Sequence, residues 1–450
     1  PFAPPQAPSA PDVDAVSTKP TPPRAMAAAV LASTSPGQAR IEALQSIPAE
    51  VFRAVQKGTL PDARGEAALD LAQACVAEGR HDAAEAMLVE ATSAGSAVAA
   101  DLLAGLLEGD PQRRTLAMKA RRLAAELSPG DPRRLAALHR AATADQNANL
   151  ERALAHLQGC LQGHDVAPPP ELHFQAEQPG MLEVLTRPSR GGVGEAFRLV
   201  WEHAAPTLVR NAGVSAEGLR RLLPGEPGVG GAVFGEVVRL LGLRKAALYR
   251  GEAPGYPSAR GLLLAPPAGL LEGTLTDASP ELPFLLGAAL GASQAPQVVL
   301  LGQPIESART LFRAMLGAFG PSIGALAIDR HTAELGEALW QTLPARAQRR
   351  LTDLLAQSTP ASFDDAYASA RLASLRVGLF VSGDFRQAVR AVLVTVGQDP
   401  RLADSPGAVM DLTSELPLLA DLYRLALRPE YADARFFLPG RSGGGGQPAP

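Results

Sequence analysis

The sequence is poor in the residues from which enzymes usually build their sites. It has only two cysteines and seven histidines in 450 residues. Cys75 and Cys160 are too few for a disulfide framework and form no CxxC zinc motif, so a reducing, cytoplasmic compartment is the simpler expectation. Neither a G-x-S-x-G turn nor a Gly-Lys-Ser/Thr phosphate loop occurs. These absences argue against a serine hydrolase, a P-loop nucleotidase and a CxxC zinc domain.

Aromatic residues and long apolar runs are scarce as well. Aromatics make up 4% of the chain, and the net charge is -4 with a pI near 6.1. This balance gives no overall electrostatic reason to bind nucleic acid or an anionic membrane. No apolar run approaches the ~18–20 residues of a spanning helix, and the short run at 25–32 lacks the basic start of a signal peptide. Because the chain begins with Pro rather than Met, we expect a fragment of a longer protein.

Alanine and leucine are what the sequence has in abundance. They dominate a hydrophobic fraction of 46%, as in closely packed helices. The segment at 68–96 fits one helix–turn–helix unit of a repeat of about 34 residues. Gly79 separates its two helices, and Ala84 lies where they cross. Further small residues at the same place in later units, Ala117 and Ala153, follow at intervals of 33 and 36 residues.

This pattern resembles the tetratricopeptide repeat, with Cys75 and His81 in place of the aromatic residues that the family prefers. The overall style is similar to Ala-, Arg- and Pro-rich proteins of this family from myxobacterial-type genomes. The resemblance implies helical hairpins that stack into a curved surface, whose concave side binds a peptide or protein partner.

The stretch from Arg260 to Leu316 differs from the rest because strand-like and helix-like runs alternate in it. GLLLAP and GLLEGTL predict a β-hairpin, ELPFLLGAALGA predicts a helix, the apolar VVLL reads as strand-like, and a further helix starts near Glu306. The order is similar to that of minimal zinc peptidases, in which a hairpin leads to a helix carrying HExxH. Here Gly287 to Gly291 stand at that motif, and no histidine lies between His203 and His331. We therefore expect no metal, no cofactor and no catalytic residue.

The predicted fold is mainly α, with a small α+β domain in the middle. Its segments are a disordered Pro-rich linker at 1–24, tetratricopeptide-like repeats at 36–163, an α+β domain with a hairpin at 181–320, a C-terminal helical domain at 322–438, and a disordered tail at 439–450. Local signals predict a helix capped by Ser215, an edge strand at 246–250, and helix starts at Pro344, Ser362 with Asp365, Asp384 and Ser414.

Several other groups could carry chemistry, and each has a simpler interpretation. Glycine-rich stretches at 190–197 and 225–235 lack the lysine and hydroxyl of a phosphate loop and fit interhelical loops. His331 and Glu334 share a helix face, but no second such pair completes a di-metal site, so a solvated face is favoured. Asp364 and Asp365 suit a helix N-terminus. The basic stretch fits a salt-bridged surface better than nucleic-acid binding; it comprises Arg346, Arg349, Arg350, Arg371, Arg376, Arg386 and Arg390.

We therefore predict a non-catalytic protein–protein interaction scaffold, with the partner on the helical repeats and the oligomeric state open. The alternative is a degenerate, metal-free peptidase-like protein or another enzyme relic centred on residues 165–320. The two hypotheses differ in whether carboxylates of the middle segment converge in one site. Those carboxylates are Glu272, Asp277, Glu281 and Glu306.

Overall fold

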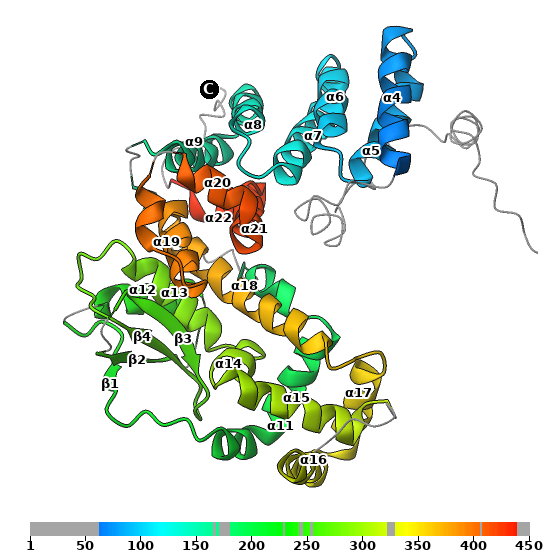
Figure 1. Ribbon diagram of the computed structural model, residues 1–450. Helices are drawn as coiled ribbons and strands as arrows, with labels where there is room; N and C mark the ends of the chain where they lie inside the picture. Colours follow the sequence, from blue (N-terminus) through cyan, green and yellow to red (C-terminus); the bar gives the residue numbers. More distant parts are fainter. Residues whose placement is uncertain are drawn as a thin grey trace, which may run out of the picture. The chain divides into compact units, whose positions relative to one another are not determined.

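The computed structural model describes most of the chain beyond residue 62 (Figure 1). The described residues are 63–164, 168–170, 181–227, 230–241, 243, 246–252, 255–321, 329–405 and 407–438. The predicted linker at 1–24, the start of the repeat segment at 36–62 and the predicted tail at 439–450 lie outside them. None of the described helices is both long and apolar enough to cross a membrane.

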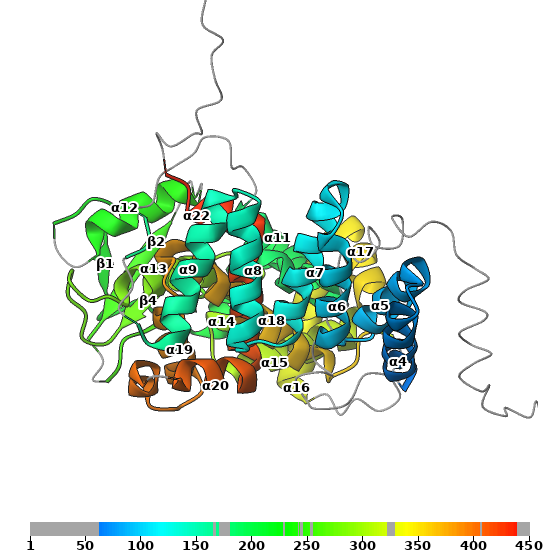
Figure 2. The same cartoon turned by 90° about the horizontal axis from the view of Figure 1, so that it is seen from above.

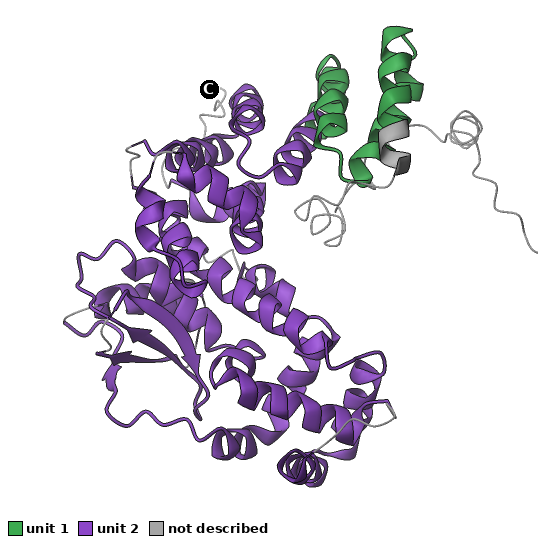
Figure 3. Ribbon diagram, viewed as in Figure 1, with its two compact units in different colours: residues 1–116 green, residues 117–450 purple. Residues whose placement is uncertain are grey.

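The chain divides into two compact units, residues 1–116 and 117–450 (Figure 3). The described part of the first unit contains α4 (Ala63–Ala77), α5 (His81–Ser93), α6 (Ala97–Glu108) and η1 (Pro111–Arg113). Helix α7 (Arg114–Leu127) begins in the first unit and continues into the second. The expected turn between α4 and α5 is present, because Gly79 adopts φ +72°, a conformation that favours glycine. Ala84 is fully buried at the start of α5.

The second unit is also mainly helical, as expected. Before the sheet it contains α8 (Pro132–Ala144), α9 (Ala148–Gln162), α10 (Met181–Thr186), η2 (Arg187–Ser189) and α11 (Gly192–Ala212). Around and after the sheet follow α12 (Gly231–Leu240), α13 (Leu282–Ala292), α14 (Gln297–Leu301), α15 (Ile305–Phe319), α16 (Arg330–Thr342), α17 (Ala345–Leu355), α18 (Ser362–Ser382), α19 (Phe385–Thr395), η3 (Pro400–Asp404), α20 (Ala408–Glu415), α21 (Pro417–Ala426) and α22 (Pro429–Arg435). Figure 2 shows α8 and α9 side by side, as a helical hairpin requires.

A small mixed sheet supplies the β part of the predicted middle domain. Its strands are β1 (Arg220–Leu222), β2 (Ala247–Gly251), β3 (Ser258–Leu262) and β4 (Ala268–Glu272), in the order β1-β2-β4-β3. The antiparallel pair β3–β4 is the hairpin expected from the sequence. β2 pairs with β1 on one side and, in parallel, with β4 on the other, so the expectation of an edge strand at 246–250 is wrong.

Two further local predictions, a helix capped by Ser215 and a strand-like run at VVLL, are wrong. Ser215 accepts the N–H of Glu217 but closes a turn that leads into β1 instead of a helix; Gly218 at φ +77° follows in that turn. The strand-like VVLL run forms the short helix α14 instead, with Val298 and Val299 buried in a helical core. An apolar run of four or five residues fits a buried helical turn as well as a strand.

Two of the predicted helix starts, at Pro344 and Asp384, are confirmed. Pro344 immediately precedes α17, and the side chain of Asp384 caps α19 by accepting the N–H of Arg386 at 2.9 Å. Ser362 instead accepts the N–H of Thr359, in the turn before α18, and Ser414 lies inside α20. Those two serines therefore do not cap the helices assigned to them.

Helix α13 lies between the β-hairpin and the long helix α18 (Figure 1), and glycines allow both close approaches. Towards the sheet, a Cβ on Gly261 would lie 2.7 Å from the carbonyl oxygen of Ala292. Towards α18, a Cβ on Gly287 would lie 2.8 Å from the carbonyl oxygen of Val377. Every residue of α13 but Pro283 is buried, so this helix is the centre of the second unit.

One hydrophobic core crosses the domain boundaries expected from the sequence. It contains Leu154 of α9, Leu248 of β2, Phe284 of α13, Phe380 of α18 and Tyr423 of α21, all almost fully buried. A second core joins α11, α14, α15, α16 and α17. The boundaries expected after α9 and after α15 therefore do not separate independent cores, because helices on either side of each boundary bury their apolar faces together.

Candidate functional site

The carboxylates of the middle segment each bind a different partner. Glu272 accepts the guanidinium N–H of Arg260 at 3.1 Å across the hairpin. Asp277 accepts the backbone N–H of Gly230 at 2.7 Å, just before α12. A carboxylate therefore lies at the start of α12, where it would repel a phosphate.

The other two carboxylates pair with arginines elsewhere. Glu281 lies 3.3 Å from Arg390 of α19, and Glu306 lies 2.8 Å from Arg309 of its own helix. None of the four carboxylates belongs to a cluster of metal-ligating groups among the described residues. The convergent polar site that an enzyme centred here requires is not formed by these groups.

The position of the peptidase motif in α13 is filled by helix packing. Gly287 and Gly291 stand one turn apart, where HExxH would place its two histidines. Both face α18, since a Cβ on Gly291 would lie 3.0 Å from the Cβ of Val377 and one on Gly287 would lie 2.8 Å from that of Val381. No side chain larger than hydrogen fits at either position without moving α18.

The remaining sequence candidates are mostly paired or solvated. His331 and Glu334 are exposed on α16, and Glu334 pairs with Arg330 at 2.7 Å. In the basic stretch, Arg376 is buried and makes two hydrogen bonds of 2.7 and 2.6 Å to the carboxylate of Asp421. These contacts fit a structural role.

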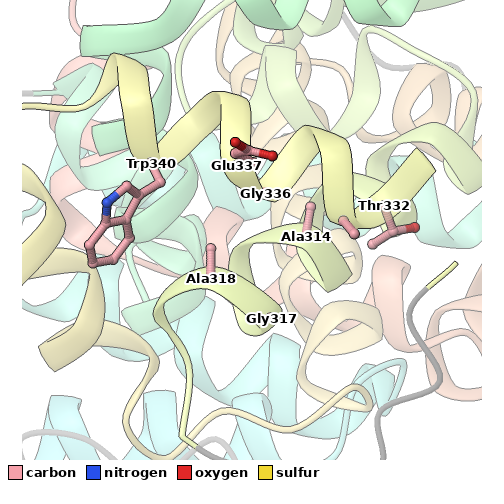
Figure 4. Close-up of a pocket in the computed structure, with 8 residues that line it drawn as sticks. Ala314, Gly317, Ala318, Thr332, Gly336, Glu337 and Trp340 are labelled. Atoms are coloured by element: carbon pink, nitrogen blue, oxygen red, sulfur yellow. The ribbon is translucent and has the colours of Figure 1, made fainter. Parts of the chain in front are cut away.

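A surface groove of about 420 Å³ lies between α15 and α16 (Figure 4). Small residues line its floor, and Trp340 and Thr332 stand at its two ends. Trp340 stacks on Phe319 with ring centroids 5.4 Å apart and remains 52% exposed. Glu337 is the one ionisable lining residue, so this groove can bind apolar groups but offers no acid–base pair.

The first unit exposes an apolar stripe on α6. Val98 and Leu102 lie one turn apart and are 46% and 38% exposed, whereas Leu103 and Leu107 on the other side of the helix are fully buried. Gly105 continues the exposed stripe, with open space around it. The surrounding sequence is acidic, because residues 68–110 contain eight carboxylates, one arginine and no lysine.

A buried polar cluster in the second unit escaped the sequence reasoning. His156 and Cys160 are one turn apart on α9, and their Nε2 and Sγ atoms are 3.6 Å apart. The Sγ lies 3.8 Å from Oδ1 of Asp384, the residue that caps α19. The available signal was the spacing of a histidine and a cysteine at i and i+4; the 224 residues between Cys160 and Asp384 hid the third member.

The surroundings of this cluster are strongly desolvated. Burial, together with the nearby charge of Asp384, raises the pKa of the Cys160 thiol to about 12. Burial also raises the pKa of Tyr431 and lowers that of Arg435. Arg435 donates to the carbonyl oxygens of Pro170 and Ser382 at 2.6 and 2.9 Å. A cluster of buried ionisable groups with shifted pKa values is a candidate functional site.

Comparison with known proteins yields no relative: no family model, no curated protein and no solved structure matches this chain.

Proposed function

We propose that the protein is a non-catalytic interaction scaffold whose helical repeats bind a peptide segment of a partner protein. The observation that carries this proposal is the exposed stripe of Val98 and Leu102 on α6. In tetratricopeptide-like pairs, which this segment resembles, the first helix of each pair lines the concave surface, and α6 is the first helix of the second pair. Exposed apolar side chains one turn apart are suited to hold apolar anchors of a peptide.

The charge around the stripe specifies the partner further. An excess of carboxylates over residues 68–110 attracts a positively charged segment and disfavours an acidic one. Part of this charge is neutralised within the unit, since Glu85 pairs with Arg113 at 2.5 Å and Glu78 lies 3.7 Å from Arg80. We infer that the partner segment carries two apolar anchors flanked by lysine or arginine. Nucleic acid and anionic membranes fit this surface poorly.

The alternative, an enzyme relic centred on residues 165–320, has less support. Its carboxylates are held by separate partners. Its motif position is occupied by Gly287 and Gly291, which press against α18. A relic that keeps a ligand site needs a cavity at this position, and the helix contact leaves none there.

We also propose a reducing, cytoplasmic setting. Cys75 and Cys160 are both free and buried in separate helices. Neither supplies the structural disulfide that proteins of oxidising compartments commonly use.

Selection from a random peptide library displayed on phage tests the proposed partner chemistry. The immobilised bait is the full chain, and a second selection uses the Val98→Asp, Leu102→Asp double variant. We expect the full chain to enrich basic peptides with two apolar anchors and the variant to enrich none of them. Enrichment of acidic peptides, or the same peptides from both baits, would refute the proposal.

A matched control comes from the second unit. Val396 and Leu402 are exposed to 42% and 41%, close to the values for the α6 residues. The Val396→Asp, Leu402→Asp variant adds the same charge and removes the same apolar side chains. It should enrich the same peptides as the unmodified chain.

A further inference from the structure

The cluster of His156, Cys160 and Asp384 joins two helices that are far apart in the chain. Two of its members lie on one face of α9, and the third begins α19. The three ligating atoms, an imidazole nitrogen, a thiol sulfur and a carboxylate oxygen, all lie within 4.8 Å of one another. It is the one group of three or more such side chains at this spacing among the residues that the structure describes.

Two of the three distances in the cluster are close to those of a tetrahedral zinc site, and the third is at most 4.8 Å. With zinc–ligand bonds of about 2.0 to 2.3 Å, ligand atoms in a tetrahedron are separated by roughly 3.4 to 3.6 Å. The observed Nε2–Sγ distance is 3.6 Å and the Sγ–Oδ1 distance is 3.8 Å. Small side-chain adjustments would therefore bring all three atoms to bonding distance from one ion.

The chemistry of the three donors selects the metal. A thiolate and an imidazole bind zinc and other late transition metals, whereas magnesium and calcium prefer oxygen ligands alone. Zinc with one thiolate, one carboxylate and a neutral imidazole has no net charge. A neutral assembly suits this place in the fold, because Cys160 is 1% exposed and His156 is 8% exposed.

The geometry points to a zinc site formed by His156, Cys160 and Asp384, with a fourth position left for water or a small ligand. Zinc at this place ties α9, the second helix of the third predicted repeat unit, to the start of α19. This assignment is independent of the proposed scaffold function, since it uses no residue of the first unit.

Neighbouring groups hold the ligands in place. The carboxylate of Asp384 also accepts the backbone N–H of Arg386 at 2.9 Å, which fixes its orientation. The ring of His156 packs against Phe436 with centroids 5.8 Å apart. Two arginines of the same core donate to backbone carbonyls: Arg386 to that of His164, and Arg435 to that of Ser382.

Metal analysis of the full chain tests the assignment. The protein is stripped with EDTA, incubated with zinc chloride, passed over a desalting column and analysed by mass spectrometry for zinc. Stripped protein is also titrated with cobalt(II), whose tetrahedral thiolate complexes give visible d–d bands and a near-ultraviolet charge-transfer band. We expect one zinc per chain, and a cobalt spectrum with the thiolate band.

Three variants identify the ligands. Cys160→Ala should lose the thiolate band and at least tenfold in zinc affinity. Asp384→Asn should weaken zinc binding while it keeps the helix cap, because asparagine caps as well as aspartate. Cys75→Ser, which alters the other cysteine, should bind zinc and cobalt like the unmodified chain.

Two results overturn the assignment. One is that the stripped, unmodified chain, shown to be folded by circular dichroism, takes up no zinc above the level of a buffer control. The other is that Cys160→Ala keeps the cobalt thiolate band, which places the metal elsewhere. If Cys160→Ala does not fold, the Asp384→Asn variant decides: unchanged zinc affinity then refutes the site.

Discussion

Replacing Gly287 of α13 by alanine tests whether α13 and α18 pack as closely as the structure requires. In an exposed helix, alanine is more stable than glycine by about 1 kcal/mol, because it restricts the unfolded chain. At Gly287, however, the new Cβ would lie 2.8 Å from the carbonyl oxygen of Val377 and 2.8 Å from Cγ2 of Val381. Contacts of this kind are relaxed only at about 3.5 Å or more, so the helices must separate by roughly 0.7 Å.

The expected cost exceeds the helix-propensity gain. Overpacking a well-packed core costs about 1–3 kcal/mol, and the atoms in the way include backbone, which cannot rotate aside. We therefore expect Gly287→Ala to lower the free energy of unfolding of the second unit by about 1–2 kcal/mol. Gly235 of α12 is the control, because its Cβ would meet no atom closer than 3.5 Å. Gly235→Ala should leave the second unit as stable or stabilise it by up to ~1 kcal/mol.

Tryptophan fluorescence during urea unfolding measures this difference directly. Both tryptophans of the chain, Trp201 and Trp340, lie in the second unit, so the signal reports that unit alone. The midpoint for Gly287→Ala should fall below that of the unmodified chain, and the midpoint for Gly235→Ala should not. If Gly287→Ala is as stable as the Gly235→Ala control, the close packing of α13 on α18 is wrong.

Other predictions follow from single contacts. Asp421→Ala should destabilise the second unit by about 3 kcal/mol, because it leaves the buried Arg376 without its carboxylate. The double variant Asp421→Leu, Arg376→Met removes both charges and should recover most of the loss in urea midpoint. Gly105 lies in open space on α6, so Gly105→Ala should raise the free energy of local unfolding of that helix by up to ~1 kcal/mol. Slower amide hydrogen exchange in α6 measures this gain. The N–H of Thr332 donates to the Asp329 cap and lowers the pKa of that carboxyl group. The cap therefore stabilises the folded protein fully above the ordinary aspartate pKa, and this stabilisation is lost as the pH falls through the lowered pKa. The urea midpoints of Asp329→Ala and the unmodified chain, followed by fluorescence, should accordingly converge in acid.

The sequence predicted the elements better than their contacts. Helical periodicity and Gly79 were enough to place α4 and α5, and two apolar runs around a turn were enough for the β3–β4 hairpin. The run at 298–301 was ambiguous because four apolar residues fit either a strand or a buried helical turn. Ser362 and Ser414 were misassigned because a serine near a helix start can bond to the preceding turn or lie within a helix instead.

Long-range packing was beyond the reach of local patterns. The sequence predicted the helix α13, but no local pattern identified α18 as its neighbour. The same reason explains the missed cluster, since Asp384 lies 224 residues from Cys160 in the chain and only the fold brings the two side chains together. The boundaries near 164–180 and 320 were drawn from composition, which does not record that helices on both sides share one core.

The affinity of one peptide for three proteins tests the scaffold proposal most directly. The peptide is the basic sequence most enriched on the full chain, labelled with a fluorophore and titrated by anisotropy. Against the unmodified chain and the Val396→Asp, Leu402→Asp control its Kd should be the same, and against Val98→Asp, Leu102→Asp it should rise tenfold or more, about 1.4 kcal/mol or above. An equal Kd for all three proteins would show that the α6 stripe does not bind the partner.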